Sequence, residues 1–288
     1  MQFSGKFMEK KMISQLFILL SLLFTINCSN SDSNLTGINP NDSLSIPGYN
    51  LVWHDEFNGS SIDEAKWRHE VNGNGGGNNE LQYYTDRPEN SFVSKGLLNI
   101  VANQEEYTGS DGTRSYTSAR LNTKLTQSFK YGKITARIKL PYGQGIWPAF
   151  WMLGSNIEQV GWPKCGEIDI VEMVGGGDGR DNVVYGTLHW DNNGHAYQGG
   201  NTHLSTGIFA DDFHEFTVDW DSTKVYWYLD GNLFYSLNIT DPTLSEFHEQ
   251  FFLILNLAVG GNWPGNPIEG TVFPQTMYVD YVRVYQKK

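Results

Sequence analysis

The chain has 288 residues, of which 39% are hydrophobic and 14% aromatic, and its formal net charge at pH 7 is −12. This negative balance argues against nucleic acid and anionic membrane surfaces as partners, because both are bound by basic patches. A neutral polymer is compatible with it, and the length allows one large all-β domain or two smaller domains.

The N-terminus has the composition of a targeting segment. Basic residues precede an apolar stretch at 12–26, which is too short for a confident membrane helix and typical of a signal peptide. We predict a signal peptide over 1–27, then a flexible Ser/Asn-rich linker over 28–48. Cys28 at the cleavage point resembles the acylated cysteine of bacterial lipoproteins, although Asn27 stands where a small residue is usual. The protein is then expected to be either a lipoprotein of the outer membrane or cell surface, or an ordinary secreted protein. In both cases it is exported.

From residue 49 onward the pattern is that of short β-strands. Helical periodicity is not convincing in this region, no linker divides it, and polar and apolar residues alternate strictly in the last strand. Strand-length segments rich in β-branched and aromatic residues, bounded by Gly, Pro or Asp, occur at 130–141, 213–220, 224–231, 251–261 and 277–286. We therefore predict one all-β domain over 49–288, a sandwich or jelly roll.

The glycine-rich segment 73–77 has neither a preceding apolar strand nor a following helix, as a dinucleotide-binding loop would. We interpret it as a loop that flanks a ligand groove, because glycine allows close approach of the backbone.

Other common catalytic chemistries find little support. Cys165 is the only cysteine besides Cys28, so it is expected to be a buried thiol without a disulfide partner if Cys28 carries lipid. His189, His195 and His203 are spaced too widely for one helix face and lack accompanying cysteines, which disfavours a catalytic metal. No Gly-x-Ser-x-Gly motif is present to suggest a serine triad. We expect no cofactor for catalysis.

Three carboxylates, Glu167, Asp169 and Glu172, lie within one strand-like segment. Side chains alternate along a strand, so Glu167 and Asp169 share a face, whereas Glu172, five residues after Glu167, belongs to the other. A β-bulge at about Ile170-Val171 would return Glu172 to the face of the other two. Neighbouring like charges raise at least one pKa, which suits an enzyme that needs one ionised and one protonated acid.

Two tryptophans precede this segment. Trp147 and Trp151 are four residues apart and therefore share a strand face. Both could fill the core, but indole rings also stack on the apolar faces of pyranose rings. Their proximity to three carboxylates favours a sugar-binding groove.

Together, Glu167-x-Asp169-x-x-Glu172 and the upstream WPAFWML resemble glycoside hydrolase family 16, the β-jelly-roll endo-glycanases. The resemblance covers nearly all of 49–288. It implies two curved antiparallel sheets with a concave substrate cleft. The extra residue before Glu172 resembles the laminarinase-type branch, since mixed-linkage lichenases lack it. The implied reaction is endo-hydrolysis of β-1,3-glucan with retention of configuration.

The resemblance also implies residue roles. Glu167 would be the nucleophile, Glu172 the acid/base and Asp169 the assistant of Glu167. It also implies a set of substrate-binding residues, most of them in the segments NNELQYYT, SARLNTK, WPAFWML, GTLHW and LNLAVGGNWPG. These residues are Asn79, Arg120, Trp147, Trp151, Trp162, His189 and Trp263.

A structural calcium ion on the convex face is implied in the same way. Its ligands would be backbone oxygens of Glu56 and Gly96 and the side chain of Asp280. We expect a monomer that binds β-glucan and touches a membrane only through a lipid anchor.

Alternatives stay open within and outside this class. The substrate could instead be mixed-linkage β-1,3-1,4-glucan or a galactan. A sulfated galactan is anionic and would require cationic subsites, which a net charge of −12 does not favour. A non-catalytic glucan-binding protein is expected to have lost one or both glutamates, and both are present here. A structural lipoprotein would leave the tryptophans and acids unexplained.

Overall fold

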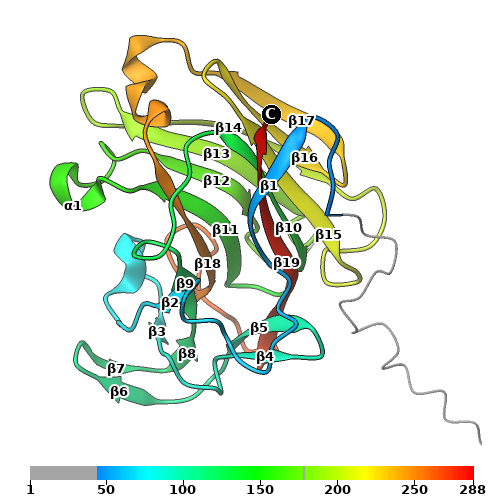
Figure 1. The fold of residues 1–288 in the computed structure, drawn as a ribbon. Helices are drawn as coiled ribbons and strands as arrows, with labels where there is room; N and C mark the ends of the chain where they lie inside the picture. Colours follow the sequence, from blue (N-terminus) through cyan, green and yellow to red (C-terminus); the bar gives the residue numbers. More distant parts are fainter. Residues whose placement is uncertain (1–43, 178) are drawn as a thin grey trace, which may run out of the picture. The chain divides into compact units, whose positions relative to one another are not determined.

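The computed structural model describes residues 44–177 and 179–288, which form two antiparallel sheets packed face to face (Figure 1). The first sheet has the spatial order β17-β16-β15-β10-β19-β5-β4, with β1 also paired to β19. Its strands are β1 (Tyr49–Asp55), β4 (Ser91–Ser94), β5 (Leu97–Ala102), β10 (Gly132–Lys139), β15 (His214–Trp220), β16 (Lys224–Leu229), β17 (Asn232–Asn238) and β19 (Gln275–Lys287).

The second sheet has the order β14-β13-β12-β11-β18-β9-β2. Its strands are β2 (Arg68–His69), β9 (Arg120–Asn122), β11 (Ile146–Gly154), β12 (Glu167–Glu172), β13 (Val183–Asp191), β14 (His195–His203) and β18 (Phe251–Val259). Two small ribbons lie outside the main sheets, β3 (Gln82–Tyr84) with β8 (Tyr116–Ser118) and β6 (Tyr107–Gly109) with β7 (Gly112–Arg114). These strands confirm the predicted all-β sandwich.

The core lies between the two sheets and explains their hydrophobic alternation. Ile134, Ala136 and Ile138 of β10 belong to the same buried cluster as Phe150 and Met152 of β11. Each of these side chains is fully buried, and burial of apolar area is the main source of stability for such a domain. The opposite face of the second sheet is therefore free to carry a binding site.

Within residues 44–177 and 179–288, helical structure occurs only in short connections. These are α1 (Ile157–Val160) and the 3₁₀ segments η2 (Gly75–Gly77) and η3 (Pro242–His248). The sequence suggested no helix at these places, because segments of this length leave no periodic signature.

Strand β19 departs from its expected pattern. Alternation of polar and apolar residues predicts one exposed face, yet every residue from Val279 to Tyr285 is buried. The outward-facing polar groups are covered by their own partners: Arg283 forms an ion pair with Glu56 at 2.7 Å and lies over the ring of Tyr281. The alternation correctly separates the two faces, but the polar face is also buried, because its side chains pair with other polar side chains.

The predicted signal peptide 1–27, Cys28 and most of the predicted linker 28–48 lie outside the described residues. Strand β1 begins at Tyr49. None of the helices in the described part is long and apolar enough to span a membrane.

Candidate active site

Strand β12 contains the bulge that the spacing of its carboxylates predicts. Asp169 pairs with Thr187 on β13, whereas Glu172 pairs with Tyr185, so three steps along β12 match two along β13. The pairing with β11 likewise leaves Ile170 without a counterpart. Because of this extra residue, all three acids of β12 line one cleft. The bulge prediction is confirmed.

A tryptophan from the opposite sheet supports the bulge from beneath. Trp227 of β16 is fully buried and donates its indole N–H to the backbone carbonyl of Asp169 at 2.7 Å. A Cβ atom at Gly186 would lie 2.3 Å from the Trp227 ring, so only glycine leaves room for the ring at this position. A bulge disrupts the ladder locally, and a buried carbonyl near it needs such a partner.

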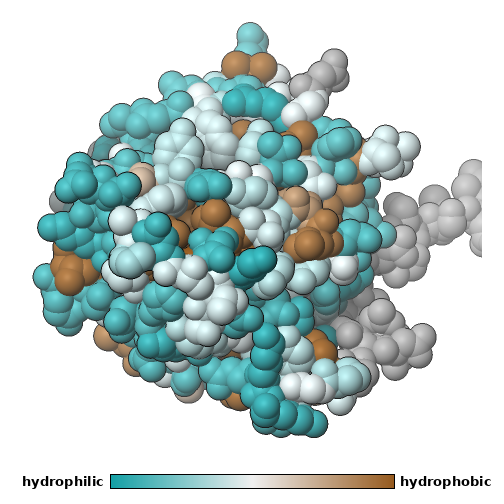
Figure 2. Space-filling view, turned by 90° about the horizontal axis from the view of Figure 1, so that it is seen from above, coloured by the Kyte–Doolittle hydropathy of each residue, from teal (hydrophilic) through white to brown (hydrophobic). Residues whose placement is uncertain are grey.

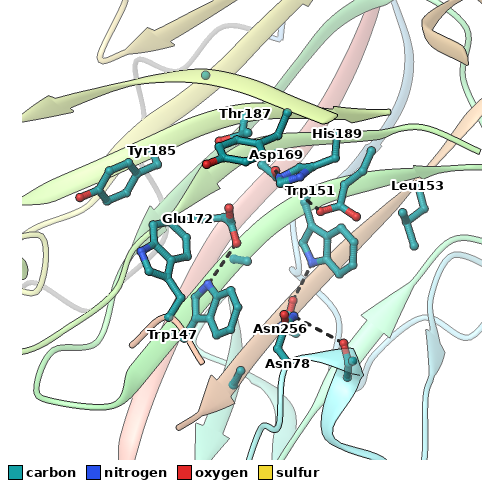
Figure 3. A pocket seen from close by; sticks show the side chains of 18 of the residues that line it. Asn78, Trp147, Trp151, Leu153, Asp169, Glu172, Tyr185, Thr187, His189 and Asn256 are labelled. Atoms are coloured by element: carbon teal, nitrogen blue, oxygen red, sulfur yellow. Dashed lines mark hydrogen bonds and ion pairs between the residues drawn. The ribbon is translucent and has the colours of Figure 1, made fainter. Parts of the chain in front are cut away.

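The cleft has a volume of about 810 Å³ and lies on the face of the second sheet that points away from the core. Figure 3 shows Trp147 and Trp151 of β11 beside Glu172 and Asp169, with Tyr185, Thr187 and His189 of β13 across from them. The predicted common face of Trp147 and Trp151 is thus confirmed. The predicted loop at 73–77 also flanks the cleft, through Gly76 and Gly77.

The three acids strongly affect one another. Burial and the neighbouring charge of Asp169 raise the pKa of Glu167 to about 8. Burial, together with the charges of Asp169 and Glu167, raises the pKa of Glu172 well above its ordinary value. Burial likewise raises the pKa of Asp169, whose side chain is 2% exposed. Burial and mutual repulsion therefore favour protonated forms within this group of acids, as expected for acid–base chemistry.

Each glutamate receives a hydrogen bond from a different tryptophan. Trp162 donates its Nε1–H to Oε2 of Glu167 at 2.8 Å, and Trp147 donates to Oε1 of Glu172 at 3.0 Å. Both bonds favour the ionised carboxylate and lower the pKa against burial. Trp162 is 48% exposed, so its ring also offers a surface to a ligand.

His189 connects the acids to the β13–β14 hairpin. Its Nε2 lies 3.1 Å from Oδ2 of Asp169 and 3.9 Å from Oε1 of Glu167. The first contact has ion-pair distance but is not aligned as a hydrogen bond, and Oδ2 of Asp169 is otherwise without a hydrogen-bond partner. The other ring nitrogen, Nδ1, is 2.8 Å from Nε2 of His195.

A line of hydrogen bonds holds Trp151. Its Nε1–H donates to Asn256 at 2.7 Å, Asn256 donates to the hydroxyl of Tyr84 at 3.1 Å, and that hydroxyl donates to Glu80 at 3.2 Å. The guanidinium of Arg120 lies over the Trp151 ring, 4.8 Å from its centroid. These contacts fix the ring plane on the cleft floor.

The remaining predicted binding residues are placed differently. Trp263 lines the end of the cleft near Glu172, with its ring 5.7 Å from that of Trp147. Asn79 is exposed and donates to Asn262, while its neighbours Asn78 and Glu80 line the cleft. The structure therefore brings all predicted binding residues except Asn79 into the cleft lining.

Two groups of residues bear on metal binding. In the described part of the chain, Glu167, Asp169 and His189 offer ligand atoms within 4.8 Å of one another. The short contact between His189 and Asp169 accounts for this cluster as a direct imidazole–carboxylate interaction.

At the predicted calcium site, Asp280 accepts from Arg137 at 2.6 Å and Glu56 pairs with Arg283 at 2.7 Å. The Arg137 contact engages the one predicted side-chain ligand, Asp280, whereas the Glu56–Arg283 ion pair leaves the predicted backbone oxygen of Glu56 out of account. The prediction through Glu56, Gly96 and Asp280 rests on the resemblance alone.

A family model described as glycosyl hydrolases family 16 matches residues 78–283. The chain belongs to this family. The match includes β12 with its three acids and every strand of the second sheet except β2. The resemblance inferred from the sequence is thereby confirmed.

Similar proteins differ in size and name. The clotting factor G alpha subunit of Tachypleus tridentatus is 45% identical over 83% of this chain, which spans only 34% of that protein. A beta-glucanase of Rhodothermus marinus is 40% identical, with 96% of both chains covered. The solved catalytic domain of an endo-1,3-beta-glucanase (laminarinase) from Thermotoga petrophila RKU-1 is 47% identical with a TM-score of 0.77, covering 83% of this chain and 98% of that one.

Several cleft residues were not predicted. Tyr185 and Thr187 share the face of His189 by simple alternation along β13, so strand periodicity could have found them. Asn192-Asn193-Gly194 is a turn signal that could have brought His195 back beside His189. Glu80 and Asn256 carry no local signal, because only the packing of distant segments brings them to the cleft.

Proposed function

We propose that this protein is an exported endo-β-1,3-glucanase that hydrolyses laminarin-like glucan with retention of configuration. One observation carries the proposal: the bulge of β12 turns all three of its acids into a single tryptophan-lined cleft. Membership of family 16 and similarity to a protein named a laminarinase support the substrate class.

Glu167 is the proposed nucleophile. Trp162 donates to one of its oxygens, and His189 lies near the other at 3.9 Å. Both neighbours stabilise a carboxylate that must be ionised when it attacks the anomeric carbon. Asp169, at the centre of the group and close to His189, modulates the charge of Glu167.

Glu172 is the proposed acid/base. Burial and the two neighbouring acids favour its protonated form, which is the form that donates a proton to the leaving oxygen. After glycosyl transfer to Glu167, the ionised Glu172 would take a proton from the attacking water. Trp147 stabilises that ionised form through its indole N–H.

Aromatic rings at both ends of the catalytic group provide the proposed sugar-binding surface. Trp162 lies at the Glu167 end, Trp151 lies opposite Asp169, and Trp147 and Trp263 lie at the Glu172 end. Arg120, which contacts Trp151 and is 14% exposed, would bind sugar hydroxyls. Ring stacking and a few hydrogen bonds from charged side chains to sugar hydroxyls are suited to binding a neutral glucan.

A parallel reducing-sugar assay on laminarin, lichenan and agarose tests the substrate class, with Glu167→Gln as the inactive control. The proposal expects laminarin to be cleaved fastest. Faster cleavage of lichenan would favour a mixed-linkage glucanase, and faster cleavage of agarose would favour a galactanase. Binding to laminarin without release of reducing ends would favour a glucan-binding protein.

Localisation and assembly complete the proposal. We infer export through residues 1–27 with a lipid on Cys28, which mass spectrometry of the mature N-terminus would detect. We also propose a monomer; on the one face that Figure 2 shows, hydrophilic residues dominate and the apolar patches are small and separated. For calcium, a higher Tm in CaCl₂ than in EDTA is expected, and equal values would contradict a bound ion.

A further inference from the structure

We infer that His195 is a positioning residue: its imidazole orients His189 toward Asp169 and supports Trp162, the donor to Glu167. Both neighbours of the proposed nucleophile therefore contact one further side chain, His195, at the mouth of the cleft. The catalytic consequence of this inference rests on the proposed function, but the geometry does not.

The β13–β14 hairpin fixes the place of His195. Its tight turn is closed by a hydrogen bond from Asn192 N–H to the carbonyl of Gly194 at 2.8 Å, and His195 pairs with Asp191 immediately after it. His189 pairs with Tyr197, so His195 is its diagonal neighbour across the hairpin. The two imidazoles stack with centroids 5.1 Å apart and planes 18° apart.

The acids determine which nitrogen of His189 carries the proton. Nε2 faces carboxylate oxygens of Asp169 and Glu167 at 3.1 and 3.9 Å, so a lone pair at Nε2 would be repelled and an N–H attracted. In the neutral ring, Nδ1 is then the acceptor, and Nε2–H of His195 donates to it across 2.8 Å. As a donor to Nδ1, His195 thus reinforces the His189 tautomer that the acids favour.

The same contact survives a change in the protonation of His189. If His189 gains a second proton, its Nδ1–H becomes a donor, and the other neutral tautomer of His195 accepts. Burial and the neighbouring His189 lower the pKa of His195. His195 therefore stays neutral and can act either as hydrogen-bond donor or as acceptor toward His189. The charged and titratable groups facing His189 are Glu167, Asp169, Glu172, His195 and Tyr197.

His195 also contacts the second partner of Glu167. The ring of Trp162 lies 4.5 Å from the ring of His195, at an angle of 47°. The indole N–H of the same tryptophan donates to Oε2 of Glu167 at 2.8 Å. The Trp162 ring is half exposed and also lies 6.4 Å from the ring of His189.

Three substitutions separate these two effects. His195→Gln retains a donor and acceptor but loses the ring, His195→Phe retains the ring against Trp162 but loses the hydrogen bond, and His195→Ala loses both. His203→Phe is the matched control, because His203 is an exposed histidine on the same strand, β14, outside the cleft lining.

For laminarin hydrolysis, His195→Phe is expected to lower kcat about fivefold to tenfold with little change in KM, as for the loss of one hydrogen bond. His195→Ala is expected to lower kcat further, by about 10- to 100-fold, while His195→Gln stays within about threefold of wild type. In ¹⁵N spectra of the imidazoles, the wild type should show His189 protonated at Nε2, and His195→Phe should show mixed tautomers.

The inference is overturned if His195→Phe and His195→Ala match His203→Phe in kcat and leave the His189 tautomer unchanged. It is equally overturned if all three His195 variants raise KM alone, because His195 would then only bind substrate. If the wild type does not cleave laminarin, the proposed function fails, while the imidazole spectra still decide the positioning role.

Discussion

Trp147 donates its indole N–H to Oε1 of Glu172 at 3.0 Å from the neighbouring strand β11. Because Trp147 is also 9% exposed and in edge contact with Trp263, the ring that lines the cleft is also the ring that adjusts the proposed acid/base. In the proposed mechanism, substrate binding and proton transfer are therefore coupled through one side chain.

Replacement of Trp147 by phenylalanine should expose this coupling. The hydrogen bond lowers the pKa of Glu172 against burial and the neighbouring acids, so its loss raises that pKa further. The alkaline limb of kcat/KM, where the acid loses its proton, is expected to move to higher pH. We expect kcat to fall about tenfold, since the ionised Glu172 loses a donor. A pH–rate profile with an unchanged alkaline limb would contradict the coupling.

The support of the bulge by Trp227 makes a separate prediction. Trp227→Phe keeps the ring in the core but removes the donor to the Asp169 carbonyl. We expect a loss of about 1–3 kcal/mol in the free energy of unfolding, the cost of one unsatisfied buried group, together with a lower kcat. Denaturant unfolding and laminarin kinetics measure the two effects.

Trp220→Phe is the matched control for this experiment. Trp220 is equally buried and donates to the backbone carbonyl of Phe247 at 3.0 Å. A similar loss of stability with unchanged kcat is expected. Equal losses of kcat in both variants would mean that Trp227 supports the fold in general and not the bulge.

The crowded acids should cost stability at alkaline pH. The pKa of Glu167 is raised from an ordinary 4.5 to about 8 in contact with two other acids, so between these values the group of acids binds more protons in the folded state than in the unfolded state. The stability contributed by this group is therefore greatest at low pH and falls as pH rises through that window. Glu167→Gln removes the ionisable group and hence this loss.

We accordingly expect the free energy of unfolding of Glu167→Gln to exceed that of wild type by about 1–2 kcal/mol at pH 8.5, so that the variant unfolds at a higher temperature. The difference should be smaller at pH 5. Calorimetry across this range provides the measurement. Glu64→Gln, at an exposed glutamate, is the control and should show no pH-dependent difference. A constant difference between wild type and Glu167→Gln at all pH values would contradict a strained carboxylate.

Parts of the structure that follow local rules could be predicted from sequence. The five-residue interval from Glu167 to Glu172 required an extra residue if the acids act together, and the register between β12 and β13 contains it. Trp147 and Trp151 followed from alternation in the same way. Both inferences depend only on the period of a strand.

Other parts depend on segments far apart in the chain. Trp227 reaches the bulge from the opposite sheet, and Glu80 reaches Trp151 through Tyr84 and Asn256. No period or spacing encodes such contacts, because they arise only when the two sheets pack. Burial of β19 on both faces has the same origin, since Arg283 and Glu56 cover a face that alternation predicts to be exposed.

The roles of the two glutamates can be tested together by azide rescue with an aryl β-laminaribioside. In a retaining mechanism, azide replaces a missing nucleophile directly and gives the inverted α-azide, whereas it attacks the glycosyl-enzyme of an acid/base variant and gives the β-azide. We expect the α-azide from Glu167→Ala and the β-azide from Glu172→Ala, identified by the anomeric proton in NMR. The reverse assignment of the two azides, or no azide product from either variant, would contradict the account.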